Sequence, residues 1–208
     1  MENLKILVAT GKTAEAGNQV EALLAGGVNA EAIVREALIP AMDEVGALVQ
    51  KGEYHIPDML VAAKAMGACM SILKPSLAGG ALKPLGKVVI GTVQGDLHDI
   101  GKNLVVVILE GSGLEVVNLG NDVAPEDFVQ AIKKENPEFV GLSALLTTTM
   151  LSMKETIEAI EKAGLRSKVK VMIGGAPVTQ EFADQIGADF YAPDATAGRE
   201  YTRQVMAG

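Results

Sequence analysis

The 208-residue sequence contains no tryptophan, and aromatic residues make up only 3% of it. Proteins that bind single-stranded nucleic acids stack the bases on aromatic side chains, so this composition argues against such a partner. Acidic residues outnumber basic ones by 26 to 18, which gives a formal net charge of −8. Because that charge repels a phosphate backbone, we expect no nucleic-acid partner.

Cysteine and histidine are almost as scarce, with one cysteine, Cys69, and two histidines, His55 and His98. These residues are too few to supply the usual ligands of a structural zinc site. Cys69 lies in an apolar pattern of helical period, which favours a packed core thiol over redox or ligand chemistry.

Long apolar runs and a targeting segment are also missing from the sequence. No run of about 18 apolar residues occurs, which argues against a membrane-spanning helix. Met1–Lys5 lacks the basic start and the long apolar stretch of a signal peptide. We therefore expect a cytoplasmic protein with no membrane partner. Since 49% of the residues are hydrophobic, the chain can still bury a substantial core.

The first 80 residues show helical periodicity and predict a small bundle of about four helices. The first two helices are expected at Leu4–Ala9 and Thr13–Leu24. The second of these ends before Gly26 and Gly27, and glycine at that position is a common stop signal.

A third helix is expected from about residue 30 to residue 49, with Asn29 as its N-cap and with Pro40 kinking or splitting it. A fourth begins at Pro57, because proline is favoured in the first helical turn. Apolar residues recur in the fourth helix at intervals of three and four, at Met59, Leu60, Ala63, Met66, Met70 and Leu73.

After a glycine-containing stretch at 76–86, strand patterns alternate with helical ones. The predicted strands are Lys87–Val93, Glu115–Leu119, Phe139–Leu145, Val169–Gly174 and Asp189–Ala192. The predicted helices lie at about 100–111, 125–135, 149–163, 179–186 and 195–206. This alternation predicts an α/β fold, a flavodoxin-like, doubly wound parallel sheet of five strands in the order 2-1-3-4-5. We expect a helical domain at 1–80, a linker at 81–86 and the α/β domain at 87–208.

In such a sheet, ligands bind beyond the carboxyl ends of the strands, at the point where the strand order reverses. The loop after the first strand carries Asp96, which could bond one ring nitrogen of His98 and leave the other nitrogen for a ligand. The loop after the third strand, Ser143–Thr149, is rich in hydroxyl groups. The loop after the fourth strand has Gly174–Gly175, where the backbone could approach a bulky ligand. Three unusual loops are therefore expected at one edge of the sheet.

Other ligands of this fold fit those loops poorly. A phosphoacceptor receiver needs an aspartate at the end of the third strand, where this chain has Ser143. A flavodoxin needs a hydroxyl-rich phosphate loop after the first strand, but here that loop is acidic. The Gly-x-Gly-x-x-Gly of a dinucleotide site is absent. A metallohydrolase built on His98 and Asp99 would need further histidines, and His55 lies in the other domain.

The three loops together resemble the signature of cobalamin-binding domains, with Asp96-x-His98-x-x-Gly101, Ser143-x-Leu145 and Gly174-Gly175. In the helical part, Met42–Gly46 and Lys51–Leu60 resemble the cap of methyl-transferring corrinoid proteins. Such caps occur in cobalamin-dependent methionine synthase and in the corrinoid subunits of anaerobic methyltransferase systems. The two resemblances imply a helical cap followed by a Rossmann-like cobalamin-binding domain. Cobalamin-dependent mutases normally lack this cap, so the methyl-transferring branch is implied.

The resemblance also implies roles for particular residues. His98 would be the lower axial ligand of cobalt, replacing the dimethylbenzimidazole of the corrinoid, and Asp96 would hydrogen-bond it. Thr149 falls where methionine synthase has the serine that extends this relay. Further contacts with the corrinoid, or with its nucleotide tail in a channel of the α/β domain, are implied for Gly95, Leu97, Asp99, Ile100, Gly101, Ser143, Leu145, Thr147, Gly174, Gly175, Asp194 and Ala195.

In the cap, the resemblance places His55 near the upper face of the corrinoid and makes Met59 a further contact. The residue patterns alone leave two other interpretations open. His55 could be a surface residue at the start of a helix, and Met59 could belong to the core of the bundle.

The function implied is that of a methyl carrier cycling between Co(I) and methyl-Co(III). A substrate-specific methyltransferase would load it, a second methyltransferase with a tetrahydrofolate or thiol acceptor would unload it, and a reductive activase would restore it. An O-demethylase system is favoured, with methylamines, glycine betaine and methanol as other donors. A cobalamin sensor or storage module, and an α/β interaction module without a cofactor, are the alternatives. No DNA-binding segment is apparent, which argues against a sensor.

Overall fold

The computed structural model describes residues 1–77 and 84–207. The chain forms two compact units. One consists of Met1–Pro84 with Val107–Gly113, and the other of Leu85–Val106 with Leu114–Gly208. The linker expected at 81–86 lies partly outside the described residues.

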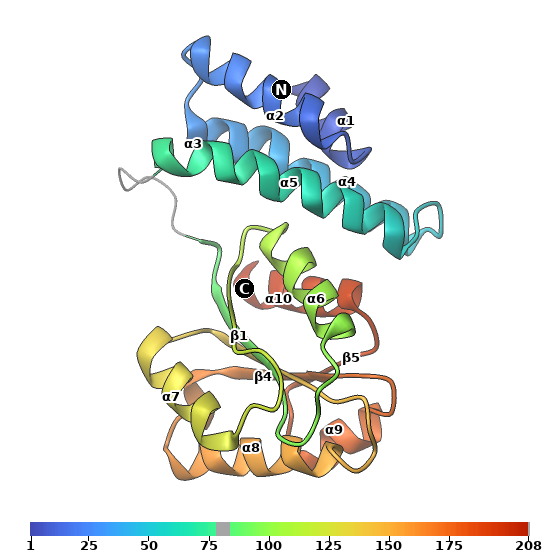
Figure 1. The fold of residues 1–208 in the computed structure, drawn as a ribbon, viewed down its shortest axis with the longest axis vertical. Coiled ribbons are helices and arrows are strands. Elements are labelled where there is room, and N and C mark those ends of the chain that lie inside the picture. The colour runs from blue at the N-terminus through green and yellow to red at the C-terminus, as the bar shows by residue number, and fades with distance from the viewer. Residues whose placement is uncertain (78–83, 208) are drawn as a thin grey trace. The chain divides into compact units, whose positions relative to one another are not determined.

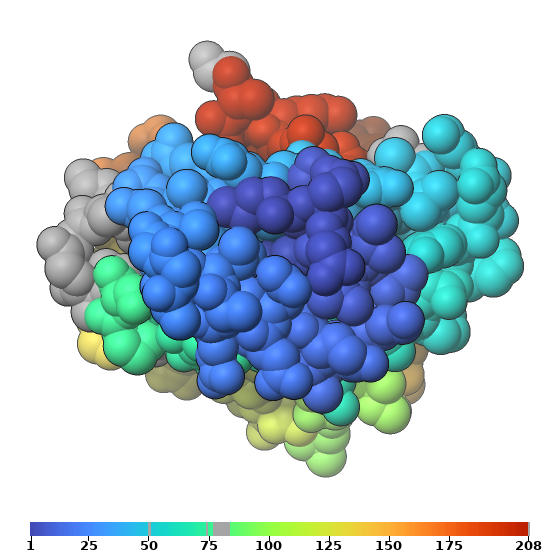
Figure 2. Space-filling view, turned by 90° about the horizontal axis from the view of Figure 1, so that it is seen from above, coloured from blue at the N-terminus to red at the C-terminus, as the bar shows by residue number. Residues whose placement is uncertain are grey.

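The first unit is helical, as the periodicity predicts. Its α-helices are α1 (Glu2–Ala9), α2 (Thr13–Ala25), α3 (Ala30–Ile33), α4 (Ile39–Gln50) and α5 (Ile56–Leu77). α2 packs along α5, and α1 contacts α2, α4 and α5. Figure 2 looks onto α1 and α2, drawn in blue. Large apolar side chains from the helices are buried together, among them Leu4, Ile33, Leu38, Met42, Met59, Met66 and Leu73.

The predicted third helix begins as expected but is not split by its proline. The side chain of Asn29 accepts a hydrogen bond of 2.7 Å from the backbone N–H of Glu31, which confirms the N-cap. A π-helical turn, Val34–Leu38, joins α3 to α4 immediately before Pro40, and Leu38 keeps helical dihedral angles. Proline has no N–H to donate to the preceding turn, and the wider turn accommodates the missing bond. The helix is therefore not split at Pro40, and the other expectation, a kink at this proline, stays a prediction.

Helix α5 contains an apolar stretch that bears on the expectation about membrane-spanning helices. By length and composition alone, Ile56–Leu73 could cross a membrane, although the core helix of a bundle passes the same test. Two charges, Asp58 and Lys64, interrupt this stretch, so it is not an unbroken apolar run. Its apolar side chains have a packing role, because they are buried at intervals from Met59 onwards. One of them is Cys69, and burial raises the pKa of its thiol to about 11, which confirms a packed core thiol.

The second unit contains the predicted sheet of five parallel strands in the order β2-β1-β3-β4-β5. The strands are β1 (Lys87–Thr92), β2 (Glu115–Asn118), β3 (Phe139–Ser143), β4 (Lys170–Gly174) and β5 (Phe190–Ala192). Four helices of this unit are α7 (Pro125–Glu135), α8 (Met150–Lys162), α9 (Gln180–Ile186) and α10 (Ala195–Ala207), with a short 3-10 turn at Arg166–Lys168. A further helix, α6 (Ile100–Glu110), begins in this unit, and its residues from Val107 onwards belong to the first unit. Elements and strand order agree with the predictions to within a few residues.

Helices lie on both faces of this sheet, as the nearly continuous apolar strands predict. Helices α7, α8 and α9 cover one face, and α10 lies on the other, with the start of α6 on the same side (Figure 1). The first face packs Val89, Val140 and Val171 of the strands against Phe128 of α7 and neighbouring helical residues. On the second face, the ring of Tyr201 stacks on Phe190 with ring centroids 4.2 Å apart. A doubly wound sheet of this kind leaves the loops at its carboxyl edge open.

Candidate functional site

The carboxyl ends of four strands meet in one row of small residues. Thr92 pairs with Ser143, Ser143 with Gly174, and Gly174 with Ala192. The row continues into the loops, because Val93 N–H donates to the carbonyl of Ser143 at 3.0 Å. The loops after β1 and β3 therefore leave the sheet side by side, at the point where the strand order reverses.

Asp96 and His98 of the first loop form the predicted pair. Asp96 is completely buried, and its Oδ1 lies 2.7 Å from Nδ1 of His98. The same oxygen accepts a hydrogen bond of 3.0 Å from the backbone N–H of His98. The imidazole is thus attached to the carboxylate through both its ring and its own backbone. The hydroxyl of Thr92 donates to the carbonyl of His98 at 2.9 Å and fixes the residue further.

The second oxygen of Asp96 binds the loop after β3. Its Oδ2 accepts hydrogen bonds from the backbone N–H groups of Leu145 at 2.8 Å and Leu146 at 3.3 Å. The hydroxyl of buried Thr149 lies 2.7 Å from the same oxygen. That hydroxyl also lies 2.9 Å from the carbonyl of Leu146, so its single proton has two acceptors within reach. One carboxylate therefore joins two loops whose residues are about 50 positions apart.

These contacts decide the protonation state of the pair. Burial alone would raise the pKa of Asp96, but the Thr149 hydroxyl, the N–H groups of His98 and Leu145 and the His98 ring hold it well below its usual range. An ionised carboxylate only accepts hydrogen bonds, so Nδ1 of His98 must carry the proton. In the neutral ring, the lone pair then lies on Nε2.

The His98 side chain is 52% exposed, so Nε2 is accessible from outside the unit. Within residues 1–77 and 84–207, Nε2 makes no hydrogen bond. Large apolar side chains at this edge are also exposed, with Leu97 at 70% and Ile100 at 87%. Leu145 and Leu146, whose backbones bind Asp96, are exposed as well. An exposed imidazole among apolar side chains is typical of a ligand site rather than of an ordinary surface.

The glycines after β4 have a visible structural role. Gly175 has φ +132°, and a Cβ atom there would lie 1.8 Å from the carbonyl oxygen of Ala144. A Cβ on Gly174 would lie 3.0 Å from the carbonyl oxygen of Ala192. The close backbone approach that these glycines permit is therefore between loops of the chain itself, and it keeps the row of small residues narrow.

The other predicted site residues fall into four groups. Asp99 accepts a hydrogen bond of 3.0 Å from the Asn103 side chain, and Gly95 and Gly101 lie on either side of the pair in the same loop and helix. Ser143 is half-buried and Thr147 is exposed at the end of β3. Two further residues lie at the start of α10: the Asp194 side chain accepts a hydrogen bond from the N–H of Ala197, and Ala195 is buried. The last two lie in the helical unit, where His55 is exposed just before α5 and Met59 is buried.

Sequence patterns missed the loop after β2. Asp122 accepts a hydrogen bond of 2.7 Å from Gly95 N–H, and the Asn121 side chain donates to the carbonyl of Leu97 at 3.1 Å. Lys102 is also buried, and its ammonium group donates to the side chain of Asn118 at 2.8 Å. The only signal in the sequence is a polar cluster after the second strand, Asn118 to Asp122, which looks like an ordinary turn.

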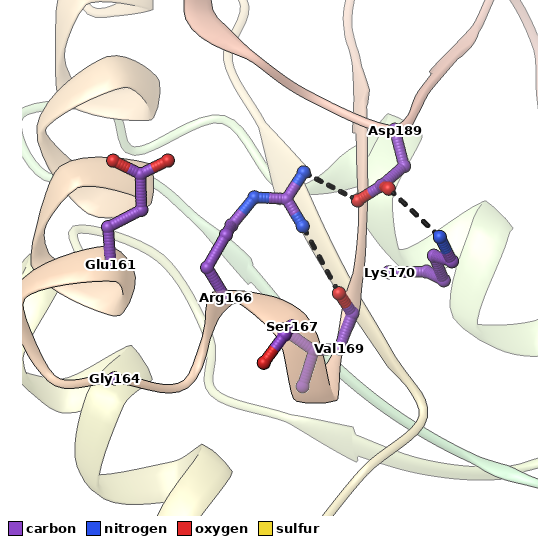
Figure 3. A pocket seen from close by; sticks show the side chains of 7 residues that line it. All are labelled: Glu161, Gly164, Arg166, Ser167, Val169, Lys170 and Asp189. Atoms are coloured by element: carbon purple, nitrogen blue, oxygen red, sulfur yellow. Dashed lines mark hydrogen bonds and ion pairs between the residues drawn. The ribbon is translucent and has the colours of Figure 1, made fainter.

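A separate pocket of about 520 Å³ lies at the opposite edge of the sheet, where β4 begins (Figure 3). Its two cations are already engaged, because Arg166 and Lys170 both pair with Asp189, at 2.7 Å and 3.3 Å. Ligands of doubly wound sheets bind at the carboxyl edge, so this pocket is not the functional site.

Comparison with known proteins agrees with the geometry. The family described as "B12 binding domain" matches residues 86–199, and a second family of the same description matches residues 1–74. The dimethylamine corrinoid protein 3 of Methanosarcina acetivorans is 44% identical over 85% of this chain and 83% of its own length.

Two solved structures resemble the whole chain. A cobalamin-binding protein from Desulfitobacterium hafniense has a TM-score of 0.80 at 35% identity, over 98% of this chain and 97% of that one. The methanol:cobalamin methyltransferase complex MtaBC from Methanosarcina barkeri has a TM-score of 0.89 at 30% identity, over 99% of this chain and 78% of the matched one.

The Asp96 network predicts a pH-dependent contribution to stability. Asp96→Ala leaves buried N–H and O–H donors without an acceptor, so we expect a loss of about 3 kcal/mol in the free energy of unfolding at pH 7. The pKa of Asp96 is lowered in the folded state, so the unfolded chain binds the proton first and stability rises with pH. The stabilisation is complete above the ordinary pKa of aspartate, near 4, and decreases below it.

Urea unfolding of the cofactor-free protein between pH 7 and pH 3 measures this effect. The difference between parent and Asp96→Ala should shrink towards the acid end. Asp184→Ala, which removes an exposed carboxylate on α9, should cost less than about 0.5 kcal/mol and serves as the control. A difference for Asp96→Ala that is constant across this range would contradict the prediction.

Proposed function

Because the chain belongs to the family of B12-binding corrinoid proteins, we propose that it carries a methyl group between two methyltransferases on a cobalamin held by His98. The observation that supports this most directly is the Asp96–His98 pair at the carboxyl edge of the sheet. The pair presents one imidazole nitrogen outward and keeps the other bonded to a buried carboxylate.

Cobalamin is the cofactor of this family, and the residues at the edge of the sheet fit it. Among the described residues, no group of three or more His, Cys, Asp or Glu side chains could hold a metal ion. A metal bound by His98 must therefore bring its other ligands with it, as the cobalt of a corrin does. The exposed Leu97 and Ile100 offer an apolar surface to such a flat macrocycle.

When bound, the corrinoid would supply a cobalt centre able to carry a methyl group. In our proposal, Nε2 of His98 would hold the cobalt, and Asp96 fixes the orientation of the ring. Thr149 completes the relay by stabilising the Asp96 carboxylate. Contacts with the corrinoid and its tail are proposed for Gly95, Leu97, Asp99, Ile100, Gly101, Ser143, Leu145, Thr147, Gly174, Gly175, Asp194 and Ala195.

We further propose that residues 1–80 form a cap domain, 81–86 a linker and 87–208 the cobalamin-binding domain. His55 is exposed at the start of α5, where it could supply a polar group over the upper face of the corrinoid. Met59 is completely buried, which favours a core position over direct contact.

The first partner in this proposal is a methylamine methyltransferase. A relative that is 44% identical is named for dimethylamine, whereas the sequence alone favoured an O-demethylase system. Methoxylated aromatic compounds are kept as the second donor class. The second methyltransferase, its tetrahydrofolate or thiol acceptor, the reductive activase and the cytoplasmic location stay predictions.

Replacing His98 tests the ligand. In His98→Ala, we expect cobalamin to bind roughly 10- to 100-fold more weakly, because no imidazole is available to the cobalt. With protein labelled with nitrogen-15 and unlabelled cobalamin, electron paramagnetic resonance of the Co(II) form should lose the nitrogen-15 coupling that marks a ligand from the protein. His55→Ala, which removes the other histidine, should keep that coupling, and a His98→Ala protein that keeps it too would refute the assignment.

Replacing Thr149 tests the relay. Thr149→Val removes a hydrogen bond that stabilises the Asp96 carboxylate, so the Asp96–His98 pair becomes more basic. We expect the pH midpoint for protonation and release of the imidazole to rise by about 0.7 unit, since one hydrogen bond contributes about 1 kcal/mol. Cobalamin affinity at neutral pH should change less.

Spectrophotometric pH titration of the cobalamin-loaded proteins measures this midpoint. Thr148→Val alters an exposed hydroxyl of the same loop and is the matched control. Coinciding titration curves for Thr149→Val and the parent would rule the relay out.

The donor is tested with the reduced, cobalamin-loaded protein and purified methyltransferases of both classes. We expect the absorbance of Co(I) to disappear with a dimethylamine-specific methyltransferase and its substrate, and to persist with an O-demethylase component and a methoxylated aromatic. The reverse pattern would overturn the choice of donor. Persistence with every donor and partner would count against methyl carriage.

A further inference from the structure

The loop between β2 and α7 forms several hydrogen bonds with the loop that carries Asp96 and His98. Asp122 accepts a hydrogen bond of 2.7 Å from Gly95 N–H through its Oδ1. Its own backbone N–H donates to the carbonyl of Asp96 at 3.0 Å. On the other side of Asp96, the amide of Asn121 donates to the carbonyl of Leu97 at 3.1 Å. One neighbouring loop therefore binds the backbone of Asp96, which holds His98, and also the backbone of the residue on each side of Asp96.

Asp122 has an uncommon backbone conformation. Its φ is +52°, in the left-handed region that few residues other than glycine, asparagine and aspartate adopt readily. Gly95, which it contacts, also has a positive φ, at +84°. The N–H group of Gly95 and the carboxylate of Asp122 therefore meet across a hydrogen bond between two residues with positive φ.

Hydrogen bonds also fix the loop between β2 and α7 to the sheet. Thr92 N–H donates to the carbonyl of Gly120, and Val123 N–H donates to the carbonyl of Thr92, both at 3.0 Å. Asn118 at the end of β2 accepts from the buried ammonium group of Lys102 at 2.8 Å. These bonds fix the position of the loop relative to β1 and α6, independently of its contacts with Asp96.

We propose that Asp122 is a positioning residue, which sets the backbone of Asp96 and thereby the direction in which His98 presents Nε2. The proposal rests on the proposed function, in which His98 binds the cobalt of cobalamin. Asp122 acts through Asp96 and touches neither ring nitrogen. Nothing in its position requires a negative charge, because the partner at its Oδ1 is a neutral N–H group.

Two substitutions separate the hydrogen bond from the backbone conformation. Asp122→Gly removes the acceptor but adopts a positive φ without strain. Asp122→Asn keeps an acceptor oxygen of the same reach and also tolerates the left-handed region. Both proteins should fold, and thermal unfolding of the cofactor-free forms confirms it. Faster amide hydrogen exchange at Gly95 in the Asp122→Gly protein verifies that the bond is lost.

The readouts are cobalamin affinity and the fraction of cobalt bound to a protein nitrogen, measured by electron paramagnetic resonance of the Co(II) form. For Asp122→Gly we expect about fivefold weaker binding, as the loss of one hydrogen bond predicts, and a reduced histidine-bound fraction. Asp122→Asn should resemble the parent in both.

The possible outcomes distinguish this proposal from the one on which it rests. A parent protein without coupling to a histidine nitrogen would remove the proposed function, and the inference with it. A parent with that coupling and an Asp122→Gly protein with parental affinity and parental coupling would overturn the inference alone. Equal losses in Asp122→Gly and Asp122→Asn would also overturn it, because they would show that charge rather than the acceptor matters.

Discussion

The carboxylate of Asp96 is the charge on which the whole edge of the sheet depends. It is completely buried, so it persists as an anion because N–H and O–H donors surround it. Those donors come from its own loop and from the loop after β3, at Leu145, Leu146 and Thr149. The need to satisfy one charge therefore fixes two loops that the sheet topology brings side by side.

The two oxygens of this carboxylate have different tasks. One holds His98 through its backbone and its ring, and the other binds Thr149 and the backbone before it. A proton taken up by the imidazole therefore changes the charge balance that Thr149 experiences, and a change at Thr149 alters the basicity of the ring. Under the proposed function, in which His98 binds the cobalt of cobalamin, this coupling would let a proton take the place of the cobalt on His98.

Much of this could be predicted from the sequence. The apolar strand patterns determined the five strands and their order, and the topology placed Asp96 and His98 beside Ser143. Sequence patterns do not predict features that depend on the backbone conformation of single residues. The left-handed conformation of Asp122 and its contact with Gly95 produce no periodic pattern in the sequence. The role of the loop between β2 and α7 was therefore not predicted. Pro40 was expected to kink or split a helix, because the periodicity does not reveal the π-helical turn that lies beside it.

Asp96 holds His98 with the proton on Nδ1 and the lone pair on Nε2, and the proposed function depends on this arrangement. Nitrogen-15 NMR of the cofactor-free protein tests this directly, because only two histidines contribute signals. At a pH where the ring is neutral, the account predicts a protonated Nδ1 and an unprotonated Nε2 for His98, and the loss of this preference in Asp96→Ala. A proton on Nε2, or a mixture of tautomers like that of an exposed histidine, would contradict it.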